Sequence, residues 1–254
     1  MKTILVAITT HKRPKWCLEL IKELHSQREG FDIKIVIFCD KDETDYTIVK
    51  DFCREFNYTY LETRVLMGKY RFWEIINLTY YYADNQDYDY WISLPDDCIP
   101  VQNFFSRAIN LLSEKYPVVN FFTMNIHTRM GATDKRVTVN DSVLMLTNWV
   151  DGCYISTKEI VQGLKIPIPI ASSMKLERVG TGVSHEQVRY FNDKGILVAQ
   201  SYYALVEHIG SLKSVMHTAK VRGEHYGKTL EFDLSSSLTE DDYNYTHDKL
   251  KQYN

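Results

Sequence analysis

The sequence lacks the glycine-rich motifs that hold phosphate groups in many α/β proteins. Neither G-x-G-x-x-G nor G-x-x-x-x-G-K-[ST] is present, and the polar loop after the first apolar segment, Thr9 to Pro14, contains no glycine. The first motif belongs to dinucleotide-binding folds and the second to P-loop proteins. The sequence therefore supports neither class, and any phosphate that this chain binds must be held by other groups.

The sequence also lacks an N-terminal apolar run long enough for a signal peptide or a membrane span. Ile4 to Ile8 give way at once to polar and basic residues. The cysteines are odd in number, widely spread and without metal-binding spacing, which is typical of reduced thiols. They are Cys17, Cys39, Cys53, Cys98 and Cys153. We therefore expect a soluble, cytoplasmic protein.

Neither sign of charge dominates the chain. Its 30 lysines and arginines face 33 aspartates and glutamates, for a net charge of −3. A protein that binds nucleic acid mainly through phosphate contacts is usually more basic. The composition, 44% hydrophobic and 25% charged, is that of an ordinary globular protein. A length of 254 residues suffices for one large domain or two small ones.

Short apolar segments alternate with amphipathic ones through the first half, which favours a parallel α/β sheet with right-handed crossovers. The second half contains a hairpin signal, Asn140-Asp141, and a capping-box pattern, Ser156 to Glu159. The predicted strands cover residues 3–8, 32–38, 58–61, 90–95, 118–124, 137–139, 143–146, 196–200 and 203–206, and the predicted helices begin near residues 14, 43, 68, 102, 156 and 184.

The most informative stretch is an apolar, aromatic segment that ends in two adjacent carboxylates. Tyr90 to Leu94 favour a strand, and Pro95 should close it because proline cannot donate to a sheet. Asp96 and Asp97 then stand at the carboxyl end of a strand, where open α/β sheets bind ligands. Adjacent carboxylates repel unless a cation or donors hold them, and they suit Mg²⁺ or Mn²⁺ beside substrate phosphates. The stretch predicts either a metal–diphosphate site or a solvated acidic turn.

Three further polar groups stand near predicted strand ends and helix starts. The first loop carries His11, Lys12 and Arg13 before a helix, and a helix N-terminus favours anions. Gly68 to Arg71 open a later helix, and Asp40 ends the second predicted strand. An acid in that position can accept hydrogen bonds from a base or ribose. For the first loop the alternative is a basic surface turn, and for Gly68 to Arg71 it is a solvated helix start. For Asp40 the alternative is a turn or capping residue.

In this order the motifs resemble the nucleotide-sugar half of a glycosyltransferase with the A-type fold (GT-A), similar to the large family-2-like group. The resemblance covers residues 3–125 well and is weaker through residue 217. It implies an α/β fold with a Rossmann-like, mainly parallel central sheet flanked by helices and a smaller mixed region on the acceptor side. It also implies a nucleotide-sugar-binding half at residues 1–125, an acceptor-binding half of the same domain at 126–233 and a C-terminal tail at 234–254.

The resemblance implies a role for each residue of these motifs. In that family an acidic pair contacts the ribose and a divalent metal of the donor complex, and by position these roles go to Asp96 and Asp97. Pro95 departs from the pattern, since a third acid often stands there. The other residues implied around the donor are Asp40 against uracil, Thr9 and Arg13 beside the base and ribose, and Lys69 and Arg71.

The second half supplies the acceptor side in such enzymes. Glu186 stands where the family often has its general base, although the pattern here is His-Glu instead of Glu-Asp. A helix-capping role is the alternative. Asp151 is a second catalytic candidate, with an ordinary turn as the alternative. His208 resembles a late histidine that completes the metal shell, and a structural histidine is the alternative.

The expected function is that of a glycosyltransferase that moves a sugar from a nucleoside-diphosphate sugar, UDP-sugars being favoured, to an acceptor hydroxyl with inversion. The expected cofactor is Mn²⁺ or Mg²⁺. The acceptor is a glycan precursor or a hydroxymethylated base in phage-type DNA. Two other classes stay open. A nucleotidyltransferase would want a glycine-rich basic loop after the first strand, and a non-catalytic carbohydrate-binding module would bind sugar without a metal.

Overall fold

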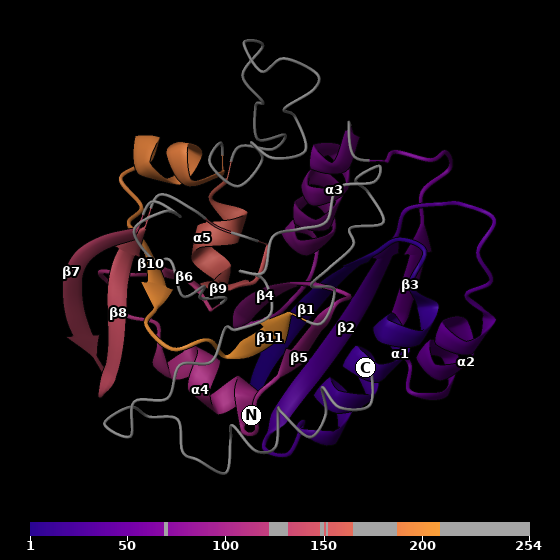
Figure 1. Cartoon of the computed structure of the whole chain (residues 1–254), viewed down its shortest axis with the longest axis horizontal. Coiled ribbons are helices and arrows are strands. Elements are labelled where there is room, and N and C mark those ends of the chain that lie inside the picture. Colours follow the sequence, from indigo (N-terminus) through magenta and orange to yellow (C-terminus); the bar gives the residue numbers. More distant parts are fainter. Residues whose placement is uncertain (69–70, 122–131, 148–149, 151, 165–186, 209–254) are drawn as a thin grey trace.

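The computed structural model describes residues 1–68, 71–121, 132–147, 150, 152–164 and 187–208, with the backbone alone for residues 132–135, 207 and 208. A nine-stranded sheet runs through these residues in the order β3-β2-β1-β4-β9-β6-β10-β8-β7 (Figure 1). A second sheet joins β11 to β5. The strands are β1 (Lys2–Thr10), β2 (Phe31–Cys39), β3 (Thr59–Glu62), β4 (Tyr90–Pro95), β5 (Cys98–Pro100), β6 (Val118–Asn120), β7 (Ala132–Val139), β8 (Ser142–Thr147), β9 (Tyr154–Thr157), β10 (Val198–Ser201) and β11 (Val206–His208).

The first four strands of this order form the parallel side of the sheet. β1 pairs in parallel with β2 and with β4, and β2 pairs in parallel with β3. Every residue from Ile4 to Ile8 is buried, as expected of a central strand that is covered on both faces. The prediction of a Rossmann-like, mainly parallel sheet is therefore confirmed for this half of the chain.

Helices cover both faces of the sheet. Side chains of α1, α2 and α4 form one apolar core with Ile4 and Val6 of β1. Side chains of α3, α5 and residues 187–193, which are also helical, form a second core with Leu5 and Ala7. The alternation along β1 thus divides the hydrophobic residues between two layers. The helices are α1 (Pro14–Ser26), α2 (Thr47–Glu55), α3 (Phe72–Asp84), α4 (Phe104–Asn110) and α5 (Lys158–Gln162).

The other side of the sheet is mixed, as predicted for the smaller region. β9 lies antiparallel between β4 and β6, β10 pairs in parallel with β6, and β8 pairs antiparallel with β10 and β7. One sheet thus continues from the first half of the chain into the second. The division at residue 125 stays a prediction.

Two predicted helices begin later than expected, and for the first of them side-chain turns give the reason. The helix expected from residue 43 begins at Thr47. Before it, Asp42 accepts a hydrogen bond from the Thr44 amide at 2.8 Å, and Asp45 accepts one from the Thr47 amide at 2.8 Å. Such aspartate turns compete with helical hydrogen bonds. The helix expected near residue 102 likewise begins later, at Phe104.

The capping-box prediction at Ser156 to Glu159 is wrong. The residue that caps α5 is Thr157, without a side-chain capping hydrogen bond, and Ser156 belongs to β9. Ser156 lies opposite Trp91 of β4 and Val118 of β6. Pairing with two strands of the sheet therefore outweighs the local capping signal. The second capping pattern, at residues 184–187, falls largely outside the described residues.

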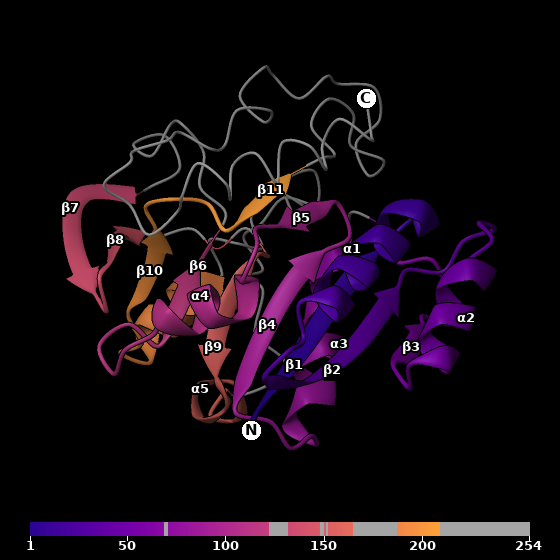
Figure 2. The ribbon, with the colours of Figure 1, turned by 90° about the horizontal axis from the view of Figure 1, so that it is seen from below.

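The two-stranded sheet brings a late segment of the chain to the end of β4 (Figure 2). A strand is predicted at residues 203–206, whereas β11 starts at Val206 and pairs antiparallel with β5. In this register His208 lies opposite Cys98, the residue after Asp97. None of the helices in the described ranges is both long and apolar enough to span a membrane.

Candidate functional site

Three neighbouring strands end at the same edge of the sheet. β1, β2 and β4 are parallel neighbours, so the loops that follow Thr10, Cys39 and Pro95 meet there. Backbone hydrogen bonds continue the ladder beyond two of these strands. The Asp40 amide donates to the Thr10 carbonyl at 2.9 Å, and the Asp96 amide donates to the Thr9 carbonyl at 3.0 Å. The acids that follow β2 and β4 are therefore fixed relative to the loop that follows β1.

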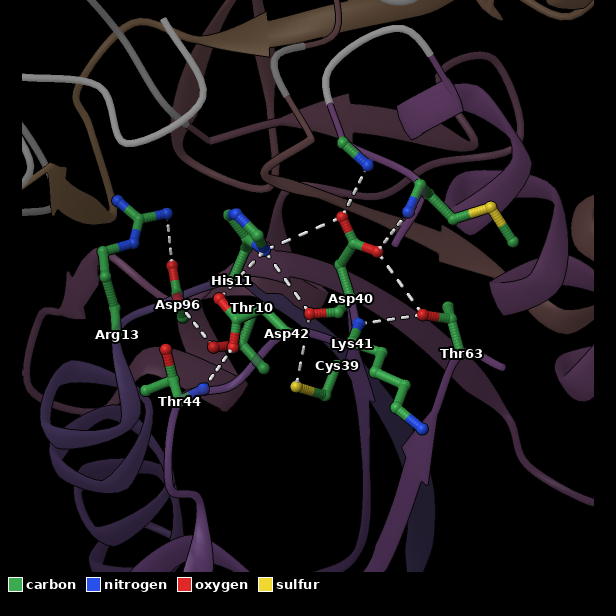
Figure 3. Close-up of polar contacts among 12 residues, drawn as sticks. Thr10, His11, Arg13, Cys39, Asp40, Lys41, Asp42, Thr44, Thr63 and Asp96 are labelled. Atoms are coloured by element: carbon green, nitrogen blue, oxygen red, sulfur yellow. Dashed lines mark hydrogen bonds and ion pairs between the residues drawn. The ribbon is translucent and has the colours of Figure 1, made fainter. Parts of the chain in front are cut away.

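The acidic pair after β4 is buried and held by neighbouring groups. Asp96 is 0% exposed and Asp97 is 4% exposed. The Thr10 hydroxyl donates to Asp96 Oδ2 at 2.6 Å, and Arg13 Nη2 lies 2.5 Å from Asp96 Oδ1 (Figure 3). Arg13 Nη1 donates to Asp97 Oδ2. These contacts exclude the alternative of a solvated acidic turn.

Burial and charge oppose one another in this cluster. Burial raises the pKa of Asp96, the positive charge of Arg13 acts against that rise, and the negative charge of Asp97 adds to it. For Arg13, burial by itself would lower the pKa, but the charges of Asp97 and Asp96 outweigh burial and raise it. The guanidinium therefore stays charged and compensates the acidic pair.

The backbone of Arg13 is fixed by groups around it. Lys12 before it has a left-handed conformation with φ of 59°, and Pro14 after it begins α1. The Arg13 amide donates to the Tyr46 hydroxyl at 3.2 Å, and that hydroxyl lies 3.0 Å from the Thr10 hydroxyl. Sequence reasoning missed Thr10 and Tyr46. No local pattern marks Tyr46, since its role depends on packing across 33 residues of sequence.

Asp40 is buried and its carboxylate holds the loop that leads to α3. Asp40 Oδ1 accepts from the Met67 amide at 2.7 Å and lies 3.4 Å from the Thr63 hydroxyl, which donates to it. Asp40 Oδ2 accepts from the Gly68 amide at 2.8 Å. Gly68 has a φ of +60°, which glycine adopts without strain. Figure 3 shows Asp40 and Thr63 in the same view as Asp96 and Arg13.

His11 lies between two acids at this edge. Its Nδ1 is 3.7 Å from Asp40 Oδ2 and 3.9 Å from Asp42 Oδ2 (Figure 3). Nδ1 is also 3.4 Å from the Asp40 carbonyl oxygen. His11 is buried. The buried edge thus carries Asp40, Asp42 and His11 on one side and the cluster of Arg13 with the acidic pair on the other.

The remaining predicted residues lie apart or outside the described residues. Arg71 precedes α3 and is exposed, and it forms two hydrogen bonds to Glu74, at 2.5 and 2.7 Å. Thr9 is buried at the end of β1. His208 is placed by its backbone opposite Cys98. The predicted residues outside the described ranges are Lys69, Asp151 and Glu186.

The donor set at this edge fits a divalent metal that substrate oxygens also bind. Both oxygens of Asp96 already contact Thr10 or Arg13, so Asp97 is the acid better able to ligate a metal. No group of three or more histidine, cysteine or acidic side chains that could hold a metal occurs within the described residues. Mg²⁺ commonly takes one or two carboxylates and completes its shell with phosphates and water. The arrangement is compatible with that mode of binding.

The described residues also form an open, polar cleft of about 450 Å³ away from this edge, and it contains none of the predicted site residues. It lies between the end of α1 and the start of α4, and Ser26, Gln27, Gln102 and Asn103 are among its lining residues. Phe31, at the amino end of β2, also lines it. The cleft is thus on the opposite side from the buried acids, and the charged cluster is the better candidate for chemistry.

No protein-family model matches the chain, and no curated protein matches its sequence. Solved structures match it in fold. The chain aligns with S. aureus TarS 1–349 at 14% identity and a TM-score of 0.51, covering 81% of this chain and 60% of that one. It aligns with glucosyl-3-phosphoglycerate synthase from Mycobacterium tuberculosis, solved with Mn²⁺ and UDP-Glc, at 14% identity and a TM-score of 0.52, covering 82% and 71%.

A third match is the mannosyltransferase PcManGT from Pyrobaculum calidifontis, solved with GDP-Man and Mn²⁺. Its identity is 12% and its TM-score 0.52, with 78% of this chain and 56% of that chain covered. This chain is thus similar in fold to larger proteins, and it spans less than two thirds of two of the three described here. Identities this low establish the fold, and the predicted GT-A fold is confirmed.

Proposed function

We propose that this chain is a glycosyltransferase that moves a sugar from a nucleoside-diphosphate sugar to an acceptor hydroxyl, with UDP-sugars favoured as donors. The observation that carries the proposal is the buried pair Asp96-Asp97, paired with Arg13 at the carboxyl edge of the sheet. Support comes from the shared fold, because two of the similar proteins were solved with UDP-Glc or GDP-Man and Mn²⁺. Ligands of open α/β sheets bind at this edge.

Asp97 would hold the metal, Mn²⁺ or Mg²⁺, together with oxygens of the diphosphate, and His208 is the proposed second ligand from the protein. When bound, the metal would neutralise charge on the leaving nucleoside diphosphate. Arg13 lies beside Asp97, so its guanidinium can add hydrogen bonds to the same diphosphate. The leaving group would therefore be stabilised by two kinds of positive charge.

Thr9, Asp40, Lys69 and Arg71 are the proposed donor contacts away from the acidic pair. A carboxylate has about four acceptor positions. Met67 and Gly68 donate to Asp40 through their amides, so a uracil N–H would share the carboxylate with them or replace one of them. A ribose hydroxyl would likewise have to share Asp96 with the Thr10 hydroxyl and Arg13.

The transfer step needs a base for the acceptor, and Glu186 or Asp151 is proposed for this role. The carboxylate takes the proton of the acceptor hydroxyl. The acceptor oxygen then bonds to the anomeric carbon while the bond from that carbon to the diphosphate oxygen breaks. A single displacement of this kind inverts the anomeric configuration. For the acceptor we propose a hydroxyl-bearing glycan precursor, and the similar structures offer no support for a DNA acceptor.

The first test is ligand-dependent thermal stability. UDP, GDP, CDP and ADP are added to the purified protein with and without Mn²⁺, and the unfolding midpoint is recorded. A ligand that binds only the folded state stabilises it by about 2.7 kcal/mol at roughly 100 times its Kd. We expect UDP to raise the midpoint strongly only when Mn²⁺ is present. The same diphosphate then identifies the sugar nucleotides whose turnover is followed by NMR, which also reports the anomer formed.

Asp97→Asn is the informative variant and Asp51→Asn is its matched control. Both remove one carboxylate, but Asp51 is exposed on α2 and contacts none of the described site residues. We expect Asp97→Asn to lose the Mn²⁺-dependent shift and Asp51→Asn to keep it. An equal response of both variants would contradict the proposal. The four corresponding nucleoside triphosphates are added in the same way, and stabilisation by them alone would contradict the proposal in favour of nucleotidyl transfer.

A further inference from the structure

The positive charge that balances the acidic pair comes from the chain itself. Among the ion pairs of the described residues, those of Arg13 reach both acids, with Nη2 on Asp96 and Nη1 on Asp97. The planar guanidinium can donate in parallel to two carboxylates, which a lysine ammonium cannot match. Arg13 therefore occupies the position of a counter-ion at the edge of the sheet.

A divalent metal on Asp97 would meet this guanidinium directly. Asp97 Oδ2 accepts a hydrogen bond from Arg13 Nη1, so a metal that binds this oxygen competes with the guanidinium for its electron density. A metal ion on Asp97 and the Arg13 guanidinium would also repel each other, because both are positively charged and contact the same carboxylate. The repulsion is strong because the site is buried. The Arg13 side chain thus opposes metal binding while it stays in contact with Asp97.

The surroundings of Arg13 allow such a movement of the side chain alone. Its backbone amide is bonded to the Tyr46 hydroxyl at 3.2 Å, which holds the main chain. Its side chain is 16% exposed, whereas those of Asp96 and Asp97 are 0% and 5% exposed. The guanidinium carbon lies 5.3 Å from the centroid of the Trp16 ring, and this aromatic face can stay beside the guanidinium when it leaves the acids. Of these three side chains, that of Arg13 is therefore the least buried and has the most room to change its conformation.

We propose that Arg13 is a positioning residue that competes with the metal for Asp97 and is displaced when metal and diphosphate arrive together. A diphosphate offers the displaced guanidinium a new anionic partner. Metal alone should therefore bind weakly, and metal and nucleoside diphosphate should each strengthen binding of the other, as linkage requires. The coupling to the diphosphate rests on the proposed function, whereas the competition at Asp97 does not.

The test is a titration of Mn²⁺ without nucleotide, followed by the electron paramagnetic resonance signal of the free ion. We expect Arg13→Gln to bind Mn²⁺ at least about tenfold more tightly than the unaltered protein, the scale of one charged hydrogen bond. Lys15→Gln is the matched control, because it removes one positive charge from an exposed side chain two residues away on α1. Lys15→Gln should change the affinity by no more than about twofold, as for an exposed, screened charge.

Two further variants make each outcome decisive. Arg13→Lys keeps the charge but loses the two-pronged contact, so it should show an intermediate gain and it decides the matter if Arg13→Gln does not fold. Adding Asp97→Asn to Arg13→Gln should abolish the gain. The proposal is overturned if the folded Arg13 variants bind Mn²⁺ no better than Lys15→Gln, since Arg13 would then organise the acids for the metal.

A second titration adds UDP. In the unaltered protein UDP should strengthen Mn²⁺ binding, and in Arg13→Gln this strengthening should be smaller, because the competition is already gone. If UDP has no effect on any variant while Arg13→Gln still gains affinity for Mn²⁺, the proposed function fails and the competition at Asp97 stands. If UDP acts equally on all variants, the diphosphate does not draw Arg13 away.

Discussion

At the scale of single residues, Asp40 shows how one buried carboxylate organises a distant loop. It accepts the amides of Met67 and Gly68 at 2.7 and 2.8 Å, although these residues lie 27 and 28 positions along the chain. Hydrogen bonds to an ionised acceptor are roughly twice as strong as neutral ones. The loop before α3 is therefore tied to the carboxyl end of β2, beside the acidic pair.

The substitution Asp40→Asn measures how much these hydrogen bonds to the loop contribute to stability. An asparagine can accept with only one of its two terminal atoms, so one loop amide would face an NH₂ group and remain buried without an acceptor. We expect the free energy of unfolding in urea to fall by about 1.5–3 kcal/mol. The exposed control Asp51→Asn should fall by less than about 0.5 kcal/mol. Equal stability of the two variants would show that Asp40 does not anchor the loop.

At the scale of elements, the β7–β8 hairpin combines a local turn with a tertiary contact. Asn140 and Asp141 have φ of 46° and 66°, the left-handed values of a tight hairpin turn. The hairpin predicted from Asn-Asp between apolar runs is therefore confirmed. Asn140 Nδ2 also donates to the carbonyls of Asn110 and Leu112, at 3.0 and 3.2 Å. The turn thus packs on the end of α4, which the local pattern does not reveal.

Substitutions at Asp141 should change stability in opposite directions. Glycine adopts a positive φ without a clash from Cβ, so Asp141→Gly should raise the free energy of unfolding by about 0.5–1 kcal/mol. A β-branched residue is strained there, so Asp141→Val should lower it by about 1–2 kcal/mol. Urea unfolding of both variants beside the unaltered protein checks the signs. The same sign for both would mean that the turn conformation does not control the hairpin.

At the scale of the whole molecule, both apolar cores contain ionisable groups that are held neutral. Burial raises the pKa of Cys39 and of Cys53 to about 11, in the core on one face of the sheet. Burial likewise raises the pKa of Tyr80 to about 12 in the core on the other face. In the unfolded chain these groups lose their protons at lower pH, so they contribute to the stability of the fold only while they stay protonated.

Stability should therefore fall on the alkaline side. The folded-state pKa values are raised, so the stabilisation is complete below the ordinary values of 9.0 for cysteine and 10.0 for tyrosine and is lost as pH rises through about 11 to 12. We expect the free energy of unfolding in urea to drop by about 2–4 kcal/mol between about pH 7.5 and about pH 10.5.

Cys53→Ala tests the origin of this drop. The variant is less stable at both pH values because it leaves a small cavity, but the cavity cost cancels in the difference between them. With one buried thiol removed, the alkaline drop should be smaller by about 1–2 kcal/mol. Equal drops in the two proteins would assign the effect to other groups.

The sequence by itself determined the fold class and the composition of the acidic edge. Pro95 ends β4 as predicted because proline cannot extend a ladder, and this places Asp96 and Asp97 at the carboxyl end of the strand. The unbroken apolar run of β1 likewise indicated a central strand covered on both faces. These are local consequences of residue type and of side-chain alternation, so they can be read from neighbouring positions alone.

Only the tertiary structure decided which groups meet. Arg13 contacts Asp97 across 84 positions of sequence, Asp40 holds the Met67 amide, and β9 inserts between β4 and β6. The insertion of β9 also overrides the capping signal at Ser156. Such pairings depend on sheet order and register, in which distant segments compete for the same partners. A local pattern states that Arg13 is a cation near a helix start, but only the folded chain makes it the counter-ion of the acidic pair.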